Sequence, residues 1–384
     1  RFKCDWSSDV CSSDLGWLAA DFREIEHGIV VGERGRMAVA NDFEVVRTRN
    51  DRRSLRGVRA VDFADGLNAW AVGDGGLVLK TSNGGVSWEA PAKPLPQEVS
   101  VFTDFKAVTT RGPKLWIAGS PGGRVWHSPD AGRSWVARPT GQSLPLHALA
   151  FVSEQVGFAV GAFGTILRSD DGGESWSVVR GESRRAAMLS LHARPERVPF
   201  NALTKYAGEN GYRAVSVIVP RWETLSDRDS SGPIERRAND ALLVVGGQTA
   251  ELGWRLPVTL PEVDRSVDRL TEEWQKQTEG RMVEIVMSDF VAKLRQWRPT
   301  VVVLDQPAAA DAVGQLVFAG AKRAINDAAD PTRFPEHDEL AGLSPWRVER
   351  VCVQVDSHDS ARIIIDPFEP LPRSEEHRLN SSHT

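Results

Sequence analysis

The stretch Thr81-Ser82-Asn83-Gly84-Gly85-Val86-Ser87-Trp88 recurs in the first half of this 384-residue chain. It returns as Ser128-Pro129-Asp130-Ala131-Gly132-Arg133-Ser134-Trp135 and as Ser169-Asp170-Asp171-Gly172-Gly173-Glu174-Ser175-Trp176. All three copies fit the pattern Ser/Thr-x-Asp/Asn-x-Gly-x-Ser-Trp, and their tryptophans are spaced 47 and 41 residues apart. Repetition at this period is typical of β-propeller blades and of other repeat arrays.

Each copy has the composition of a tight turn between two strands. Asp or Asn accepts hydrogen bonds from its own turn backbone, and Gly adopts a positive φ without a Cβ clash. The Trp adds a large apolar surface and an N–H group that needs a partner when it is buried. We therefore predict a turn-stabilising role, with direct ligand contact as the alternative, for Thr81, Asn83, Gly85, Trp88, Ser128, Asp130, Gly132, Trp135, Ser169, Asp171, Gly173 and Trp176.

A second phrase, in which a Gly-containing turn separates two apolar runs, precedes each of these turns. Its copies are residues 70–79, 116–126 and 158–167, and a fourth copy at 28–39 lacks the Trp motif after it. Short apolar runs flanked by Gly indicate strands joined by turns. The sequence thus predicts a partial propeller of about four blades, each a four-stranded antiparallel sheet, over residues 16–182.

These residues resemble the Asp-box, or bacterial neuraminidase repeat, propellers of photosystem II stability and assembly factors. The resemblance implies a fold that binds or scaffolds other molecules. Sialidases carry the same box, but they use a catalytic Tyr and an arginine cluster. The two tyrosines of this chain, Tyr206 and Tyr212, lie outside the repeats. We therefore do not expect sialidase chemistry.

The second half alternates predicted strands with predicted helices. Strands are expected at 187–191, 213–219, 249–256 and 301–304, and helices at 199–210, 235–245 and 309–328, with a largely helical stretch over 262–297. This order predicts a doubly wound, mostly parallel α/β domain over residues 183–370. Ligands of such folds bind at the carboxyl ends of the strands. The candidate ligand-binding residues are accordingly His192, Arg194, Arg221 and Asp305.

Phrases over residues 186–368 resemble, in their order, those of PIG-L-type N-acetylglucosaminyl deacetylases. They are Leu191-His192, Gly211-Tyr212-Arg213, Trp297-Arg298-Pro299-Thr300-Val301 and Pro345-Trp346-Arg347. The resemblance implies a zinc ion held by His-Pro-Asp-Asp and by a later His-Pro-Asp-His. Here the first motif reads His192-Ala193-Arg194-Pro195-Glu196 and the later one falls on Pro307-Ala308-Ala309-Ala310. Only His192 keeps its place as a metal ligand, with Glu196 one position out of register, so no catalytic residue is assigned.

We therefore expect a non-catalytic binding or assembly protein that needs no cofactor. It would join a propeller scaffold to a pseudo-deacetylase domain that binds a polar, sugar-like ligand or contacts a protein partner. Two alternatives stay open. One is a divergent zinc-dependent deacetylase acting on N-acetylated sugars, which needs three protein ligands for its metal. The other is a scaffold devoted only to protein assembly.

The two ends of the chain differ in composition from the rest. Residues 1–15 and 371–384 resemble translated sequencing-adapter tracts, so we expect a non-native leader and tail, with genuine tails as the alternative. The native amino terminus would then be missing, which leaves the location open and compatible with export to the periplasm. The net charge of −5 gives no argument for nucleic acid. No apolar run approaches the roughly 18 residues that span a membrane.

Overall fold

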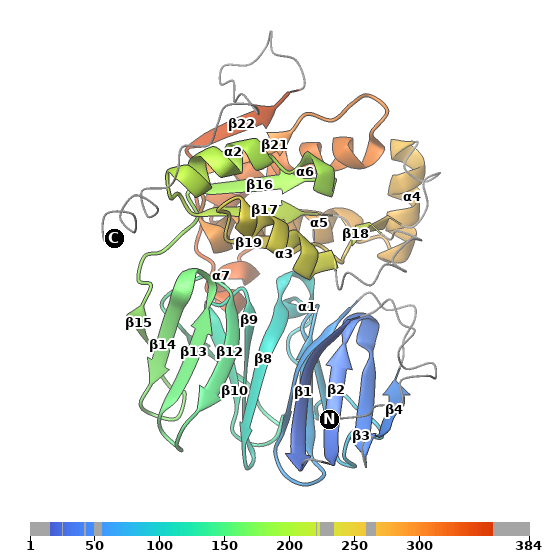
Figure 1. Ribbon diagram of the computed structural model, residues 1–384, viewed down its shortest axis with the longest axis vertical. Helices are drawn as coiled ribbons and strands as arrows, with labels where there is room; N and C mark the ends of the chain where they lie inside the picture. Colours follow the sequence, from blue (N-terminus) through green and yellow to red (C-terminus); the bar gives the residue numbers. More distant parts are fainter. Residues whose placement is uncertain are drawn as a thin grey trace, which may run out of the picture.

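The computed structural model of the chain describes residues 16–24, 26–41, 44–49, 56–219, 221–222, 234–258 and 266–355, with the backbone alone at 44–49, 221–222, 234 and 257–258. The expected leader 1–15 and tail 371–384 lie outside the described residues. Four antiparallel sheets form one body, and a parallel sheet with helices forms a second body stacked on one end of it (Figure 1). A propeller-like half followed by an α/β half is thus confirmed.

Each of the four antiparallel sheets corresponds to one repeat. The first consists of β1 (Trp17–Glu24), β2 (His27–Gly32), β3 (Met37–Asn41) and β4 (Glu44–Arg49). The second consists of β5 (Val58–Phe63), β6 (Ala69–Gly73) and β7 (Leu77–Thr81). The third, which follows the short helix α1 (Val99–Phe102), consists of β8 (Asp104–Arg111), β9 (Lys114–Ser120), β10 (Arg124–Ser128) and β11 (Val136–Pro139). The fourth consists of β12 (Leu146–Phe151), β13 (Gly157–Gly161), β14 (Thr165–Ser169) and β15 (Ser177–Arg180).

The prediction of four strands per blade is wrong for the second sheet. Its fourth position holds a single bridge between Lys80 and Glu89. Pro91, Pro94 and Pro96 follow this bridge closely. Proline has no N–H group to give to a strand ladder, so the pairing ends there.

The blades stack face to face through their alternating apolar side chains. The first strands of successive blades, β1, β5, β8 and β12, are neighbours in that order. Trp116 is fully buried between the third and fourth blades, and its ring centre lies 4.0 Å from that of Phe151. Large aromatic contacts of this kind give much of the stabilisation of a small core.

The Asp-box residues close tight turns at the end of the blades that faces away from the α/β body (Figure 1). In the third copy, the Gly173 N–H donates to Ser169 Oγ (2.8 Å) and the Ser175 N–H donates to Asp171 Oδ1 (2.9 Å). The other two copies repeat both bonds. The Trp176 indole N–H is buried and finds no hydrogen-bond partner in the described part of the chain, unlike its two counterparts.

The α/β body contains a five-stranded parallel sheet of order β19-β17-β16-β21-β22. Its strands are β16 (Met188–His192), β17 (Ala214–Ile218), β19 (Thr249–Leu252), β21 (Val301–Asp305) and β22 (Arg350–Gln354), and β18 (Arg221–Trp222) pairs separately with β20 (Pro257–Val258). The helices are α2 (Phe200–Leu203), α3 (Ile234–Val244), α4 (Val267–Gln277), α5 (Met282–Trp297), α6 (Ala312–Ala329) and α7 (Glu336–Ala341).

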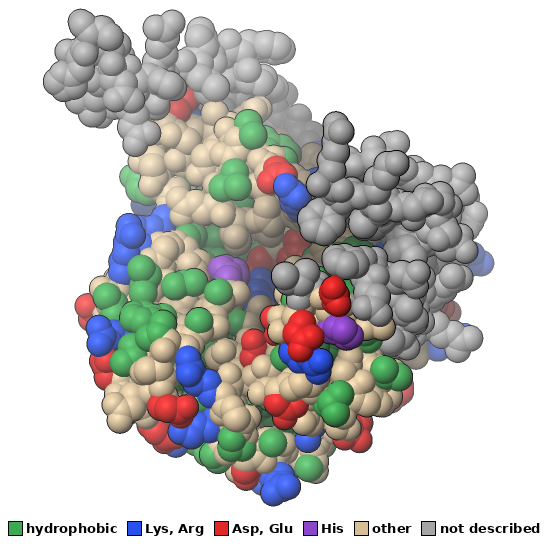
Figure 2. All heavy atoms as spheres, turned by 60° about the horizontal axis from the view of Figure 1, so that its bottom comes forward, with side chains coloured by type: hydrophobic (Ala, Val, Ile, Leu, Met, Phe, Trp, Pro, Cys, Tyr) green, Lys and Arg blue, Asp and Glu red, His purple; other side chains and the backbone are tan. Residues whose placement is uncertain are grey.

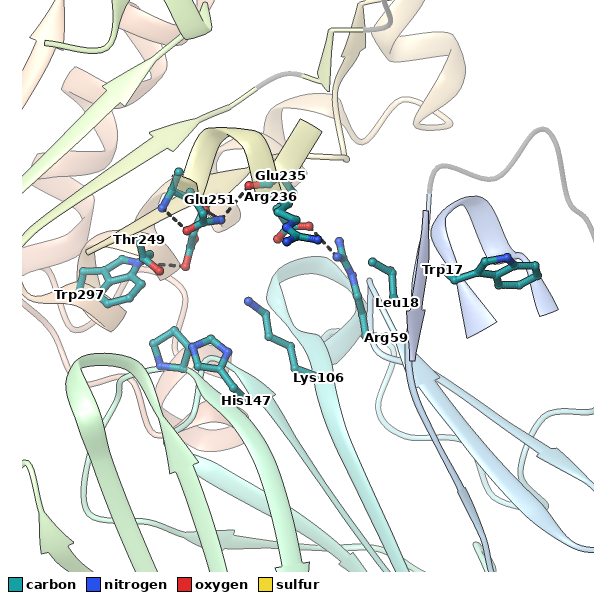
Figure 3. Close-up of a pocket in the computed structure, with 13 residues that line it drawn as sticks. Trp17, Leu18, Arg59, Lys106, His147, Glu235, Arg236, Thr249, Glu251 and Trp297 are labelled. Carbon is teal, nitrogen blue, oxygen red and sulfur yellow. Dashed lines mark hydrogen bonds and ion pairs between the residues drawn. The ribbon is translucent and has the colours of Figure 1, made fainter. Parts of the chain in front are cut away.

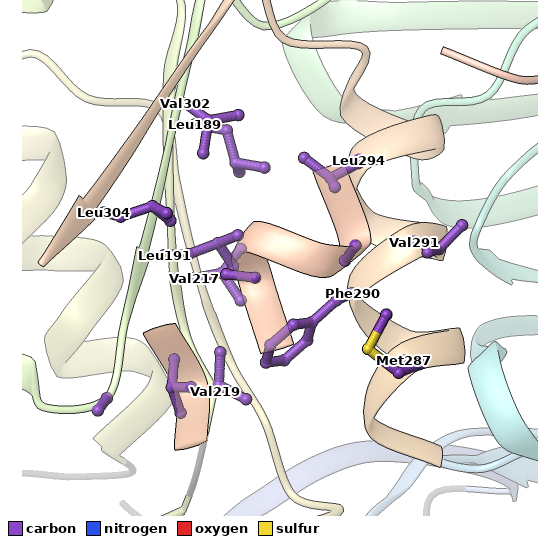
Figure 4. Packing of buried hydrophobic residues seen from close by; sticks show 14 of the residues in the cluster. Leu189, Leu191, Val217, Val219, Met287, Phe290, Val291, Leu294, Val302 and Leu304 are labelled. Atoms are coloured by element: carbon purple, nitrogen blue, oxygen red, sulfur yellow. The ribbon is translucent and has the colours of Figure 1, made fainter. Parts of the chain in front are cut away.

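Helices cover both faces of this sheet, as a doubly wound fold requires. One face packs Leu191 and Val217 against α5 residues such as Phe290 (Figure 4). The other face packs Met188 and Ile218 against residues that include Leu203 and Leu242. A strand buried on both faces has to be apolar along its whole length, which explains the unbroken apolar runs of the sequence.

The stretch expected to be largely helical, 262–297, contains α4 and α5, separated around Gly280, which has a φ of +82°; residues 259–265 lie outside the description. One expected strand is wrong in extent. The strand expected over 249–256 ends at Leu252 as β19. After it the chain turns toward the propeller, where Trp254 and Arg255 meet Asp104 of β8.

The two bodies meet through buried charges and apolar side chains. The Asp104 carboxylate accepts bonds from the Trp254 indole N–H and from the Arg255 guanidinium, each at 3.1 Å. Phe102 of α1 lies against His337 of the α/β body, with ring centres 4.5 Å apart. The contact is therefore a packed interface and not a loose tether.

Candidate functional site

The carboxyl edge of the parallel sheet carries two of the residues that the sequence singled out. His192 is the last residue of β16 and Asp305 the last of β21. These neighbouring strands flank the point at which the strand order reverses. In open α/β sheets such a switch point is the usual place for a ligand.

Ion pairs fill much of this edge. Arg197 Nη2 lies 2.6 Å from Asp305 Oδ1, and Arg194 Nη2 lies 3.1 Å from Asp311 Oδ1. The remaining space beside Asp305 measures about 10 Å³, which is room for roughly one water molecule. Glu196 is exposed to solvent. Both predicted polar residues of this edge, Arg194 and Asp305, thus have partners within the protein.

His192 is completely buried, and neither ring nitrogen has a hydrogen-bond partner among the described residues. Desolvation, with a further contribution from the charge of Arg197, lowers the pKa of His192 to about 3. Since a pKa of this size lies well below neutrality, the imidazole is uncharged at pH 7.

The side chains at this edge do not fit the zinc site that the deacetylase resemblance implies. A hydrolytic zinc site needs three protein donors converging on one point. Here the buried imidazole of His192 is accompanied by two carboxylates, of Asp305 and Asp311, that are already held by arginines. Within the described residues, no group of three or more His, Cys, Asp or Glu side chains is placed to hold a metal ion. We therefore derive no zinc chemistry from this edge.

The fourth predicted ligand-binding residue, Arg221, lies apart from the end of β17. Its backbone forms β18, which pairs with β20 instead of joining the main sheet. Its side chain lies outside the description. A shared ligand of Arg221 with His192, Arg194 and Asp305 stays a prediction.

A larger cavity, of about 410 Å³, lies between the propeller and the α/β body. Each blade contributes to its floor from its first strand, and α3, β19 and the end of α5 form its roof (Figure 3). Its lining comprises Trp17, Leu18, Arg59, Lys106, Pro145, His147, Glu235, Arg236, Asn239, Thr249, Ala250, Glu251 and Trp297. Cavities of about 300–1,000 Å³ are typical of small-molecule sites.

The four floor residues Leu18, Arg59, Lys106 and His147 occupy the same position of their respective blades. Each lies at the irregularity in the pairing of the first strand with the second strand. A β-bulge of this kind adds one residue to a strand and changes the direction of a side chain. The four bulges thereby place one side chain per blade in the cavity.

A glycine opposite each bulge makes this geometry possible. A Cβ on Gly73 would lie 2.1 Å from the Gly57 carbonyl oxygen, and a Cβ on Gly119 would lie 2.1 Å from that of Asp104. The glycines of the first and last blades, at positions 32 and 161, meet the equivalent carbonyl groups. The Gly that follows the first apolar run of each repeat is therefore needed, because the two backbones approach closely beside the bulge.

Most of the charges around the cavity are paired. Arg59 contacts Glu235 (2.6 Å) and Asp74 (2.7 Å), and Glu251 contacts Lys293 (2.5 Å). By contrast, Lys106 projects into the cavity with no hydrogen bond or ion pair to any residue that the structure describes (Figure 3).

His147 lies beside Lys106 on the floor of the cavity (Figure 3). Desolvation, followed by the charge of Lys106, lowers the pKa of His147 to about 4. His147 lines the cavity and its side chain is partly exposed. Its imidazole, neutral at pH 7, is therefore an accessible hydrogen-bonding group.

No motif of the sequence predicts this cavity, although the repeats carry a signal for its floor. Leu18, Arg59, Lys106 and His147 are spaced 41, 47 and 41 residues apart, matching the spacing of the repeats. Three of the four are basic in strands that otherwise read as apolar. The roof residues carry no such signal, because they come from another domain.

The family whose model matches this chain concerns the propeller half. Residues 52–149 match the family model described as photosynthesis system II assembly factor YCF48. A photosystem II assembly lipoprotein Ycf48 of Synechococcus sp. (strain CC9902) is 32% identical over 124 residues, covering 30% of this chain and 34% of that protein. The photosystem II assembly protein Ycf48 of Synechococcus sp. (strain JA-3-3Ab) is 28% identical over 120 residues, covering 30% and 35%. This chain thus spans about a third of the length of these relatives.

Two solved structures are also similar to parts of the chain. The structure titled YCF48 bound to D1 peptide has 24% identity and a TM-score of 0.29, covering 35% of this chain and 43% of that one. YCF48 from Cyanidioschyzon merolae has 19% identity and a TM-score of 0.34, covering 45% and 59%. The N-terminal region of this chain therefore matches the photosystem II assembly factors named Ycf48 in sequence, from β5 to the start of the fourth blade.

Proposed function

We propose that this chain is a non-catalytic binding protein whose propeller half contacts a protein partner. The observation that carries the proposal is the match of residues 52–149 to an assembly-factor family. A factor that assembles a protein complex has to contact protein subunits. The matched range contains the second and third blades, which lie at the centre of the four.

The partner docks at the Asp-box end of the blades. The α/β body occupies the other end, and Figure 2 shows the Asp-box end with hydrophobic side chains scattered among charged ones. Leu67, Val86 and Val152 are 57%, 64% and 68% exposed there. The α/β body leaves this end of the blades uncovered, so these side chains are available to a protein partner.

The α/β body acts in binding and not in hydrolysis under this proposal. Two features support this: the only predicted zinc ligand left in place is His192, and Arg197 holds the carboxylate of Asp305. A sugar-like ligand at this edge belongs to the proposal as a secondary site. One of the relatives is named a lipoprotein, which supports an exported location for this chain as well. No helix of the described residues has the length and apolarity to cross a membrane.

Site-specific photo-crosslinking tests the proposal. A photoreactive residue is placed in the full chain at Val86 or at Val152, and, as the control, at Val244, which is 86% exposed on α3. We expect both Asp-box-end positions, but not position 244, to capture the same protein from a periplasmic extract of a bacterium that carries the gene.

That protein is then purified and titrated against the wild-type chain and against Val86→Glu and Val152→Glu. Because a buried charge disfavours an apolar contact, the affinity of the captured protein for each variant should be at least about tenfold lower than for the wild-type chain. Equal capture from position 244, or affinities unchanged by either substitution, would contradict the proposal.

A further inference from the structure

The cavity between the two bodies is not explained by a protein interface at the opposite end of the blades. It is bounded by both domains and has a volume of about 410 Å³. Its floor is formed by equivalent bulge residues of all four blades. A repeated backbone irregularity that turns one side chain per blade into a common space is typical of a binding site.

The charges of the lining favour an anion. Three cationic side chains, Arg59, Lys106 and Arg236, line the cavity together with two carboxylates, Glu235 and Glu251. Lys293, which is not part of the lining, pairs with Glu251 at 2.5 Å. Arg59 and Glu235 neutralise each other at 2.6 Å. Arg236 is 79% exposed at the rim, with Asp240 3.9 Å away. Lys106 is therefore the cation that lines the cavity with no ion pair to any described residue, and its charge lies near the Glu235 carboxylate.

We propose that this cavity binds a small organic monocarboxylate, with its carboxylate group held between Lys106 and His147. The Lys106 ammonium supplies a charge-assisted hydrogen bond, and the neutral imidazole of His147 supplies a second N–H donor. A single negative charge matches the single ammonium group of Lys106. A phosphate dianion would bring a second negative charge close to Glu235 and Glu251, and so binds less well.

Part of the proposed ligand is apolar, because Leu18, Pro145 and Ala250 belong to the lining. The amide of Asn239, which also lines the cavity, is already used, because it bonds the Glu235 carbonyl and both backbone groups of Ala250. We therefore expect this ligand to carry fewer hydroxyl groups than the sugar-like ligand expected at the sheet edge.

Binding measurements on the full chain test this assignment. Benzoate and hexanoate are titrated by calorimetry and by ligand-observed NMR, with benzamide and hexanamide as neutral counterparts and with gluconate and inorganic phosphate as polar and dianionic probes. We expect both apolar carboxylates to bind at least about tenfold more tightly than the amides, gluconate or phosphate, which corresponds to about 1.4 kcal/mol.

Variants locate the binding. Lys106→Gln should weaken benzoate binding at least about tenfold, and Lys106→Arg should retain most of it, because one charge-assisted bond is lost in the first case and kept in the second. His147→Gln should weaken binding by a few fold. Lys93→Gln removes an exposed lysine of the same domain and should leave the affinity unchanged.

Three results would overturn the assignment. The first is no binding of either apolar carboxylate up to about 10 mM, where even weak specific sites are occupied. The second is phosphate or gluconate binding more tightly than benzoate. The third is a folded Lys106→Gln variant with wild-type affinity. None of these bears on the protein partner, since the Asp-box end of the blades is not involved.

Discussion

At the scale of single residues, Asp104 shows how the two bodies are held together. Its carboxylate accepts bonds from the Gly75 N–H (2.8 Å) within the propeller and from Trp254 and Arg255 of the α/β body. Burial alone would raise its pKa, but the charges of Arg255 and Lys293, together with the hydrogen bonds, hold the pKa of Asp104 well below its usual range. Arg255 in turn contacts Asp289 of α5 at 3.3 Å.

We predict that Asp104→Asn lowers the free energy of unfolding by about 1.5–3 kcal/mol at pH 7, the usual contribution of a hydrogen bond to a charged group. A carboxyl with a depressed folded-state pKa stabilises the protein above its unfolded pKa of about 3.9, and this stabilisation is lost as the pH falls below that value. The difference between wild type and variant should therefore be constant from pH 7 to about 5 and shrink below about pH 4.

Urea unfolding followed by tryptophan fluorescence at several pH values measures this difference. Asp170→Asn is the matched control, since the Asp170 side chain is 62% exposed in its ion pair with Arg168, and exposed pairs contribute only about 0–1 kcal/mol. Equal stabilities of wild type and Asp104→Asn at pH 7, or a difference that grows in acid, would show that the carboxylate is not the stabilising group.

At the scale of elements, the paired bulge and glycine link the repeat to the cavity. The first two strands of each blade come unusually close beside the bulge, and a glycine on the second strand leaves room for the carbonyl group of the first. In the third blade this is the pair β8 and β9, with Gly119 facing Asp104. The same short segment thus carries Asp104 into the interface and Lys106 into the cavity.

Gly119→Ala should therefore destabilise the protein by about 1–3 kcal/mol, the range for overpacking at a rigid site. The added Cβ would lie 2.1 Å from a backbone oxygen, which cannot rotate away. The matched control is Gly66→Ala, where the nearest atom, 3.0 Å away, belongs to the flexible side chain of Arg23; its effect should stay within about 0.5 kcal/mol. Thermal and urea unfolding of both variants give the comparison, and equal effects of the two substitutions would argue against the steric role of Gly119.

At the scale of the whole molecule, the α/β body closes the propeller end where the four bulges converge (Figures 1 and 3). Apolar packing adds to the buried charges there, since Val101 and Phe102 of α1 lie in one cluster with Ala292, Ala341 and Leu343 of the α/β body. An interface packed in this way couples the unfolding of two domains.

We expect one cooperative transition for the wild-type chain in scanning calorimetry. Phe102 is 3% exposed, and replacing a buried Phe by Ala costs about 3–5 kcal/mol. Because this loss weakens the contact between the two bodies, the propeller and the α/β body of Phe102→Ala should unfold in two separate transitions. Phe200→Ala, at a side chain that is 38% exposed on α2, should keep the single transition. A single transition at wild-type temperature for Phe102→Ala would indicate that α1 does not couple the domains.

Local chemistry accounts for the parts of the fold that could be predicted from the sequence. The Ser169 hydroxyl and the Gly173 backbone that close an Asp-box turn are four residues apart, so spacing alone brings them together. Likewise, the strand at Val301–Asp305 is apolar because both of its faces are buried. His192 and Asp305 could be placed at strand ends for the same reason, since the end of an apolar run can be read from the neighbouring residues.

Contacts between distant residues could only be decided by the tertiary structure. Arg197 bonds Asp305, which is 108 positions away, and Arg59 bonds Glu235, which is 176 positions away. The residues next to either partner therefore do not predict the pair. The sequence by itself determined the repeat, its turns and the glycines, because turn sterics and hydrogen bonds act within a few residues. Only the tertiary structure decided that Arg59 pairs with Glu235 while Lys106 pairs with none of the described residues, because burial and charge pairing depend on which domain packs over the blades.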